Sequence, residues 1–63
     1  MILAEMTLDE AQDRFEASPG PQTAADLITV SMQYWNDDII GDETFAHKMT
    51  IVRDWLLADG DRA

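Results

Sequence analysis

The stretch 23-TAADLITVSMQYWNDDIIGDETFAHKMTIVRDWLLA-58 decides the fold of this chain. It predicts two amphipathic helices, at residues 24–38 and 43–58, joined by a short break at residues 39–42. Gly41 suits the left-handed conformation that ends many helices, and Asp42 is a preferred N-cap residue for the helix that follows. Because helices joined by so short a connection pack as antiparallel neighbours, the stretch predicts a helical hairpin.

The first helix of this hairpin, at residues 24–38 with Thr23 as its N-cap, is apolar over more than half of its circumference. The side chains that spread over this wide face are Ala24, Leu27, Ile28, Val30, Met32, Tyr34 and Trp35. A helix that packs on one side only needs an apolar stripe somewhat wider than about 100°. We therefore expect this helix to be the central one, covered on more than one side.

The second helix, at residues 43–58, shows a regular apolar stripe. Its members, spaced at i, i+4, i+7 and i+11, are Phe45, Met49, Val52 and Leu56. This spacing is typical of an amphipathic helix whose stripe faces the core. Glu43 complements the positive end of the helix dipole, and Gly60 is expected to end the helix.

The N-terminal part predicts a third, shorter helix. Thr7-Leu8-Asp9-Glu10 has the form of a capping box, which predicts a helix at residues 8–17 with a narrow apolar stripe. Residues 18–22 contain two prolines and are expected to form a loop. The apolar residues 1–6 are either an arm that covers the core or an exposed hook that engages a partner.

These elements together predict an all-α fold. The hairpin 24–38/43–58 and the helix 8–17 packed on it would make a small three-helix bundle, with residues 1–63 forming a single acidic domain. A chain of 63 residues buries only about 60% of the surface that its unfolded form exposes. It has no cysteine, so disulfides and thiolate metal sites are excluded.

The charge of the chain bears on its partners. Thirteen Asp and Glu residues stand against four Lys and Arg, which gives a net charge of −9. Such a chain repels nucleic acid and anionic membranes and attracts basic surfaces; direct nucleic-acid binding would need cations that it lacks. No apolar run approaches the roughly 20 residues that span a bilayer, and the first residues lack a cationic signal-peptide region. We expect a cytoplasmic protein without a membrane partner.

Two groups of carboxylates are candidate partner-binding residues. Asp9, Asp13 and Glu16 fall on one side of the helix 8–17, where like charges at i, i+4 destabilise a helix by about 0.2–0.5 kcal/mol per pair. Asp37 and Asp38 stand at the C-terminal end of the helix 24–38, where the helix dipole disfavours negative charge. The alternative interpretation is a solvated surface whose acidity serves solubility alone.

The sequence contains no motif that predicts a catalytic or metal site. There is no Gly-rich phosphate loop and no Ser nucleophile with a local partner. His47 is the only histidine, cannot build a zinc site within one chain, and is expected to be exposed beside Glu43. The carboxylates at residues 37–43 lack the alternating spacing of an EF-hand calcium loop. We expect no enzyme, cofactor or metal.

Aromatic and aliphatic side chains on the flanks of the hairpin leave two alternatives open. Trp35, Ile51 and Trp55 give more apolar width than a contact between two helices uses. They either fill the core of a monomer or form an interface with a partner or a second copy, since aromatic residues with a charged rim are typical of interface anchors.

In size, acidity and helicity the chain resembles the small inhibitors carried by phages and plasmids, among them anti-CRISPR and anti-restriction proteins. The resemblance covers composition along the whole chain, includes no motif, and transfers no site residues. It implies a non-enzymatic inhibitor that docks on a basic, nucleic-acid-binding surface of a partner protein. The alternative hypothesis is a homodimeric or small-subunit helical module with an aromatic interface, of structural or regulatory function.

Overall fold

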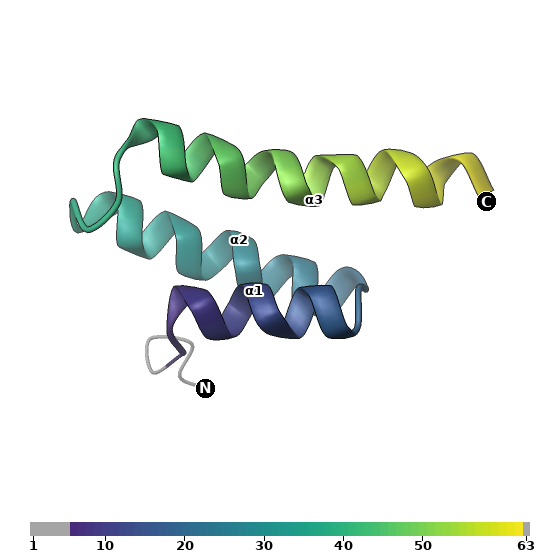
Figure 1. Cartoon of the computed structure of the whole chain (residues 1–63), viewed down its shortest axis with the longest axis horizontal. Helices are drawn as coiled ribbons and strands as arrows, with labels where there is room; N and C mark the ends of the chain where they lie inside the picture. Colours follow the sequence, from purple (N-terminus) through teal and green to yellow (C-terminus); the bar gives the residue numbers. More distant parts are fainter. Residues whose placement is uncertain (1–5, 63) are drawn as a thin grey trace.

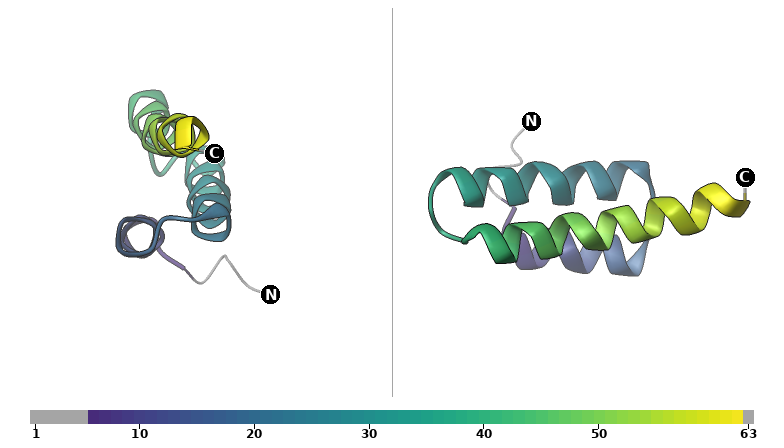
Figure 2. Two further views of the ribbon diagram at one scale, coloured as in Figure 1. Left: turned by 90° about the vertical axis from the view of Figure 1, so that its right-hand side faces the viewer. Right: turned by 90° about the horizontal axis from the view of Figure 1, so that it is seen from above.

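The computed structural model describes the backbone of residues 6–62 and the side chains of residues 6–58. Residues 6–62 form three helices in the order α1 (Leu8–Ala17), α2 (Pro21–Asn36) and α3 (Asp42–Arg62), which run up, down and up (Figure 1). Both α1 and α3 pack on α2, and an end-on view places them against different sides of it (Figure 2). This confirms the predicted all-α bundle and the central position of α2.

Helix α1 has the predicted bounds because its N-terminal cap is a local interaction. The Thr7 hydroxyl accepts a hydrogen bond from the Glu10 N–H (3.1 Å), and the Glu10 carboxylate accepts one from the Thr7 N–H (3.4 Å), so the capping box is complete. At the other end the Ser18 N–H donates to the Arg14 carbonyl (2.9 Å). Each of these bonds satisfies a backbone or side-chain group that the helix end would leave unpaired.

Helix α2 starts earlier than predicted, at Pro21, so the prediction that residues 18–22 form a loop was wrong for their last two members. A proline fits the first position of a helix because the N–H that it lacks would have no helical partner there. Gly20, with extended backbone, is the N-cap, and its carbonyl accepts from the Ala24 N–H (2.9 Å). Thr23 lies inside the first turn, and its hydroxyl donates to the carbonyls of Ser18 (2.9 Å) and Gly20 (3.2 Å).

Helix α2 also ends earlier than predicted, and a different residue ends it. The Ile39 N–H donates to the Tyr34 carbonyl (2.9 Å) and the Asp38 N–H to the Trp35 carbonyl (3.1 Å), which is the Schellman pattern of a helix C-terminus. The left-handed residue of this motif is Asp38, with φ of 61°. The expectation that Gly41 takes this conformation was wrong, since aspartate also tolerates it.

Helix α3 begins one residue before its predicted start and extends beyond its predicted end. The Gly41 carbonyl accepts from the Phe45 N–H (3.0 Å), so Gly41 caps the helix and Asp42 is its first residue rather than its N-cap. The helix continues through Gly60, which the sequence analysis expected to end it. A glycine inside a helix costs about 1 kcal/mol relative to alanine, which does not stop a helix by itself.

The core lies mainly between α1 and α2. The buried apolar residues are Leu8, Ala11, Phe15, Ala24, Leu27, Val30 and Val52. Six of these seven belong to the first two helices, and α3 contributes Val52 alone. The short helix α1, which packs on α2 as predicted, thus supplies three of these seven residues, Leu8, Ala11 and Phe15.

The predicted apolar stripe of α3 is therefore buried only in part. Phe45 and Met49 are half-buried, and Leu56 is 55% exposed. The exposure of Leu56 follows from helix length: α3 has 21 residues and α2 has 16, so the end of α3 projects past the connection between α1 and α2 (Figure 2). No neighbouring helix covers the apolar side chains on the projecting turns.

Two side-chain bridges join α1 to α3 across the side that α2 leaves open. The rings of Phe15 and Trp55 meet edge to face, with centroids 5.7 Å apart and an interplanar angle of 85°. The Lys48 ammonium donates a hydrogen bond to the Gln12 side-chain carbonyl. The edge-to-face geometry is a favoured one for aromatic pairs, so the two bridges fix the position of α3 relative to α1.

Candidate protein-docking surface

The first acidic surface follows α1. Asp9, Asp13 and Glu16 are all exposed, and they lie on the opposite side of the helix from its buried residues. The Glu16 carboxylate accepts a hydrogen bond from the Gln12 amide (3.0 Å). This neutral donor leaves the charge of Glu16 in place, so the three carboxylates present a row of negative charge along one helix face.

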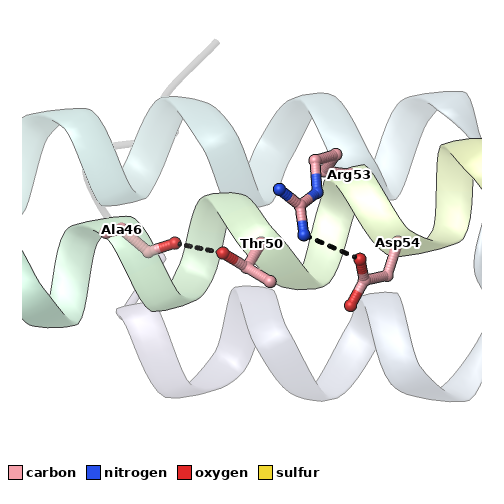
Figure 3. A network of polar contacts seen from close by, with 4 residues as sticks. All are labelled: Ala46, Thr50, Arg53 and Asp54. Carbon is pink, nitrogen blue, oxygen red and sulfur yellow. Dashed lines mark hydrogen bonds and ion pairs between the residues drawn. The ribbon is translucent and has the colours of Figure 1, made fainter.

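The described cations, Arg14, Lys48 and Arg53, form no ion pair with this row. Among residues 6–58 there is one ion pair, between Arg53 and Asp54 on α3, with N and O atoms 3.3 Å apart (Figure 3). Both side chains of that pair are exposed, so the pair contributes little to stability. Lys48, the cation that reaches α1, donates to Gln12 and not to a carboxylate. The negative charge of α1 is therefore left to solvent or to a partner.

Beside this ion pair, α3 contains one more polar contact within the helix. The Thr50 hydroxyl donates to the Ala46 carbonyl one turn earlier (2.9 Å), as Figure 3 also shows. A threonine that bonds backward in this way satisfies its hydroxyl within the helix. This stretch of α3 thus shows polar groups paired within the helix itself, in contrast to the unpaired charges of α1.

The second acidic surface is the turn between α2 and α3. Figure 1 places this turn at the same end of the bundle as the first turn of α1. The exposed carboxylates at this end belong to Asp9, Glu10, Asp37, Asp38, Asp42 and Glu43. Four of them, Asp9, Glu10, Asp42 and Glu43, lie in first turns, where the helix dipole favours negative charge. Asp37 and Asp38 follow the C-terminal end of α2, where it does not.

One carboxylate of this turn has a structural partner. The indole N–H of Trp35 donates to Oδ1 of Asp42 (2.8 Å), and the Trp35 ring stacks on Phe45 with centroids 4.4 Å apart and planes inclined by 11°. These contacts hold the two helices of the hairpin together beside the turn. Asp37 and Asp38 make no such side-chain contact with the described part of the chain, so their carboxylates are free to bind.

The three apolar candidates do not form one patch. Trp35 is 38% exposed and lies beside the turn against Phe45. Ile51 and Trp55 are half-buried and pack against the core. Trp55 follows Phe45 by ten residues on α3, which separates it from Trp35 by about 15 Å along the helix. Whether any of the three meets a partner stays a prediction.

The structure exposes apolar residues that the sequence analysis did not single out as functional. The large apolar side chains in this group are Met32, Ile39, Leu56 and Leu57. The signal that could have identified Ile39 is its position directly after Asp37-Asp38 in a turn, where polar residues, Gly and Pro are usual. The signal that could have identified Leu57 is its position outside the apolar stripe of α3, which ends with Leu56.

The described residues form no enclosed site. No pocket is present in this part of the structure, and no three side chains of His, Cys, Asp or Glu come together in an arrangement that could hold a metal ion. His47 is exposed on α3, as predicted. The exposed side chains described above are mostly charged or apolar, and the acidic ones without an ion pair lie on α1 and at the α2–α3 turn.

Known proteins offer no guide to this surface: no family model, no curated protein and no solved structure matches the chain. Within residues 6–62 none of the three helices is both long enough and apolar enough to cross a bilayer. Function is therefore inferred from the charge and exposure of the side chains described above.

Proposed function

We propose that this chain is a non-enzymatic binding protein that docks through its exposed carboxylates on a basic surface of a partner protein. The observation that supports the proposal is the set of acidic side chains on α1 and at the α2–α3 turn that form no ion pair with a cation among residues 6–58. A basic surface of this kind commonly binds nucleic acid, so the docked chain would act as an inhibitor of nucleic-acid access, as the phage and plasmid inhibitors that it resembles do. The encounter would take place in the cytoplasm.

The negative charge of the chain should speed its association with a basic partner and orient that partner toward the acidic surfaces. A net charge of −9 on a body with longest extent 36 Å steers a basic partner toward the chain and speeds association. A cation placed between Asp9 and Asp13 would also relieve their mutual repulsion at i, i+4. Because charges farther apart than about 8 Å are screened at physiological ionic strength, the complex should weaken as salt is added.

The test begins with the intact chain as bait in an extract of cells, at low and at high salt, with captured proteins identified by mass spectrometry. Affinity for the purified partner is then measured with the triple variant Asp9→Lys, Asp13→Lys, Glu16→Lys. The proposal predicts a loss of binding of at least about 100-fold, because three attractive contacts become repulsive. Circular dichroism checks that the variant stays helical.

A matched control separates local docking from total charge. Asp13→Lys and Asp54→Lys change the net charge by the same amount, but Asp54 lies on α3 beside Arg53 and outside the proposed surface. Asp13→Lys should weaken the complex more than Asp54→Lys. Equal effects of the two variants, or an affinity that the triple variant leaves unchanged, would reject docking through α1.

The second candidate function is a homodimeric or small-subunit helical module whose interface includes Ile51 and Trp55 on α3, with Trp35 as a separate contact beside the turn. The exposed apolar residues Leu56 and Leu57 on the projecting end of α3 favour it. Light scattering at rising concentration detects a dimer. Trp55→Asp would dissociate such a dimer, but Trp55 also packs on Phe15, so Leu57→Asp is the cleaner variant to run beside it.

A further inference from the structure

An apolar side chain stands exposed among the carboxylates of the α2–α3 turn. Ile39 is 63% exposed, a value that among the large apolar side chains of residues 6–58 is matched by Leu57. Residues 37–43, called the tip from here on, contain four carboxylates and neither lysine nor arginine. The tip thus combines one prominent apolar side chain with negative charge on both sides of it.

Backbone hydrogen bonds hold Ile39 in this position. Its N–H donates to the Tyr34 carbonyl (2.9 Å), and the Ile40 N–H donates to the same oxygen (3.4 Å). The next side chain, Ile40, is half-buried and packs against the core. Because the backbone at Ile39 is already held in place, a partner that covers the side chain need not order the backbone there, and this favours binding.

We propose that the chain meets its partner with the tip, and that Ile39 is the apolar anchor covered by a cationic amphipathic segment of another protein. Lysine or arginine side chains of that segment face Asp37 and Asp38. The inference rests on the proposed function, to which it adds the end of the bundle that docks and the residue that anchors it. It differs from docking through α1 alone, which needs no apolar contact.

Charge complementarity favours a cationic segment over a second copy of the chain as the partner that covers Ile39. A second copy placed tip to tip would bring four carboxylates against four, with no cation in either tip to pair them. A segment with both apolar and basic side chains covers Ile39 and neutralises its neighbours in one contact. This combination of a central apolar anchor and a charged rim is the usual composition of a protein interface.

The test uses two synthetic peptides of equal length and equal positive charge. One carries leucine and lysine at helical spacing, and the other carries serine in place of leucine. Each is titrated into the intact ¹⁵N-labelled chain, and amide shifts are followed by NMR. The leucine peptide should bind roughly tenfold more tightly, as expected when one apolar side chain leaves water, and the shifts should centre on residues 35–43.

Two variants locate the anchor. Ile39→Ser should remove the tenfold preference for the leucine peptide, whereas Leu57→Ser, at an equally exposed position on the projecting end of α3, should keep it. Circular dichroism verifies that both variants retain their helices. If Leu57→Ser removes the preference, or if the shifts centre on α1, Ile39 is not the anchor and the inference is overturned.

The outcomes also separate this inference from the proposed function. Equal binding of both peptides that weakens with salt would overturn the anchor and leave docking by charge intact. Absence of binding by both peptides would count against both. A concentration-dependent dimer that Ile39→Ser abolishes would make a second copy the occupant and so overturn the proposal of a cationic partner.

Discussion

The indole N–H of Trp35 donates a 2.8 Å hydrogen bond to Oδ1 of Asp42, and so links the last turn of α2 to the first turn of α3. Trp35→Phe would remove this bond and keep an aromatic ring against Phe45, so the free energy of unfolding should fall by about 0.5–1.5 kcal/mol. Trp35→Ala would also remove the stack, which is worth about another 0.5–1.5 kcal/mol. Urea unfolding of the three proteins measures both steps; equal stability of the Phe variant and the parent would show that the bond contributes nothing.

The left-handed backbone of Asp38 predicts a stabilising substitution. A non-glycine residue in this conformation costs about 1–2 kcal/mol, and a carboxylate at the end of α2 is disfavoured by the helix dipole. After allowance for the greater freedom of glycine in the unfolded chain, Asp38→Gly should raise stability by about 1 kcal/mol. For a domain of this size, this corresponds to a rise of about 4–8 °C in Tm.

Asp37→Gly is the control for that prediction, since Asp37 has a φ of −87° and no left-handed strain. It removes the same charge at the neighbouring position, so any gain from charge alone appears in both variants. Thermal unfolding followed by circular dichroism should therefore show a larger gain for Asp38→Gly. A gain of the same size in both would attribute the effect to charge and not to backbone strain.

Ser31 is fully buried, and its hydroxyl has no hydrogen-bond partner in the described part of the chain. Because an unpaired buried hydroxyl carries a desolvation penalty, Ser31→Ala should leave stability unchanged or raise it by up to about 1 kcal/mol. Ser31→Leu should instead lower it by about 1–3 kcal/mol, because the larger side chain overpacks the site. The denaturant midpoints of the two variants and the parent measure these changes in stability. A marked loss of stability in the alanine variant would mean that the hydroxyl is bonded.

Lys48 and Arg53 carry the same charge on the same helix but should differ in their effect on stability. Lys48→Met removes the part-buried hydrogen bond to Gln12, which joins α3 to α1, and should lower stability by about 0.5–1.5 kcal/mol. Arg53→Met removes an exposed pair and should change stability by less than about 0.5 kcal/mol. Urea unfolding at low and high salt compares them, and equal losses would show that net charge alone is responsible.

The elements that the sequence predicts well are those fixed by neighbours along the chain. The capping box of Thr7 and Glu10 determines where α1 begins, and both residues lie within one turn. The predicted start of α2 was wrong because two prolines in residues 18–22 indicate a loop, whereas a proline is also favoured at the first position of a helix, which Pro21 occupies. The end of α2 was missed because the choice between Asp38 and Gly41 depends on a few hydrogen bonds of the turn.

The burial of α3 and the pairing of charges depend on contacts between distant residues. Leu56 belongs to a regular stripe, yet its exposure follows from the lengths of the neighbouring helices. Lys48 and Gln12 are 36 residues apart, so no local pattern reveals that this lysine binds an amide and leaves the carboxylates of α1 unpaired. The exposure of Asp9, Asp13 and Glu16 did follow from helical periodicity.

The small share of the core that α3 contributes has a consequence for how the molecule opens. Val52 is the one buried apolar residue among the described side chains of α3, so we expect this helix to separate first, once its Phe15–Trp55 and Lys48–Gln12 bridges to α1 break, while α1 and α2 stay packed. Amide protons of α3 should then exchange with solvent through a partial opening, and those of α1 and α2 only when the whole chain unfolds. Native-state hydrogen exchange would thus divide the protein into an outer, readily released helix and an inner, slowly exchanging pair.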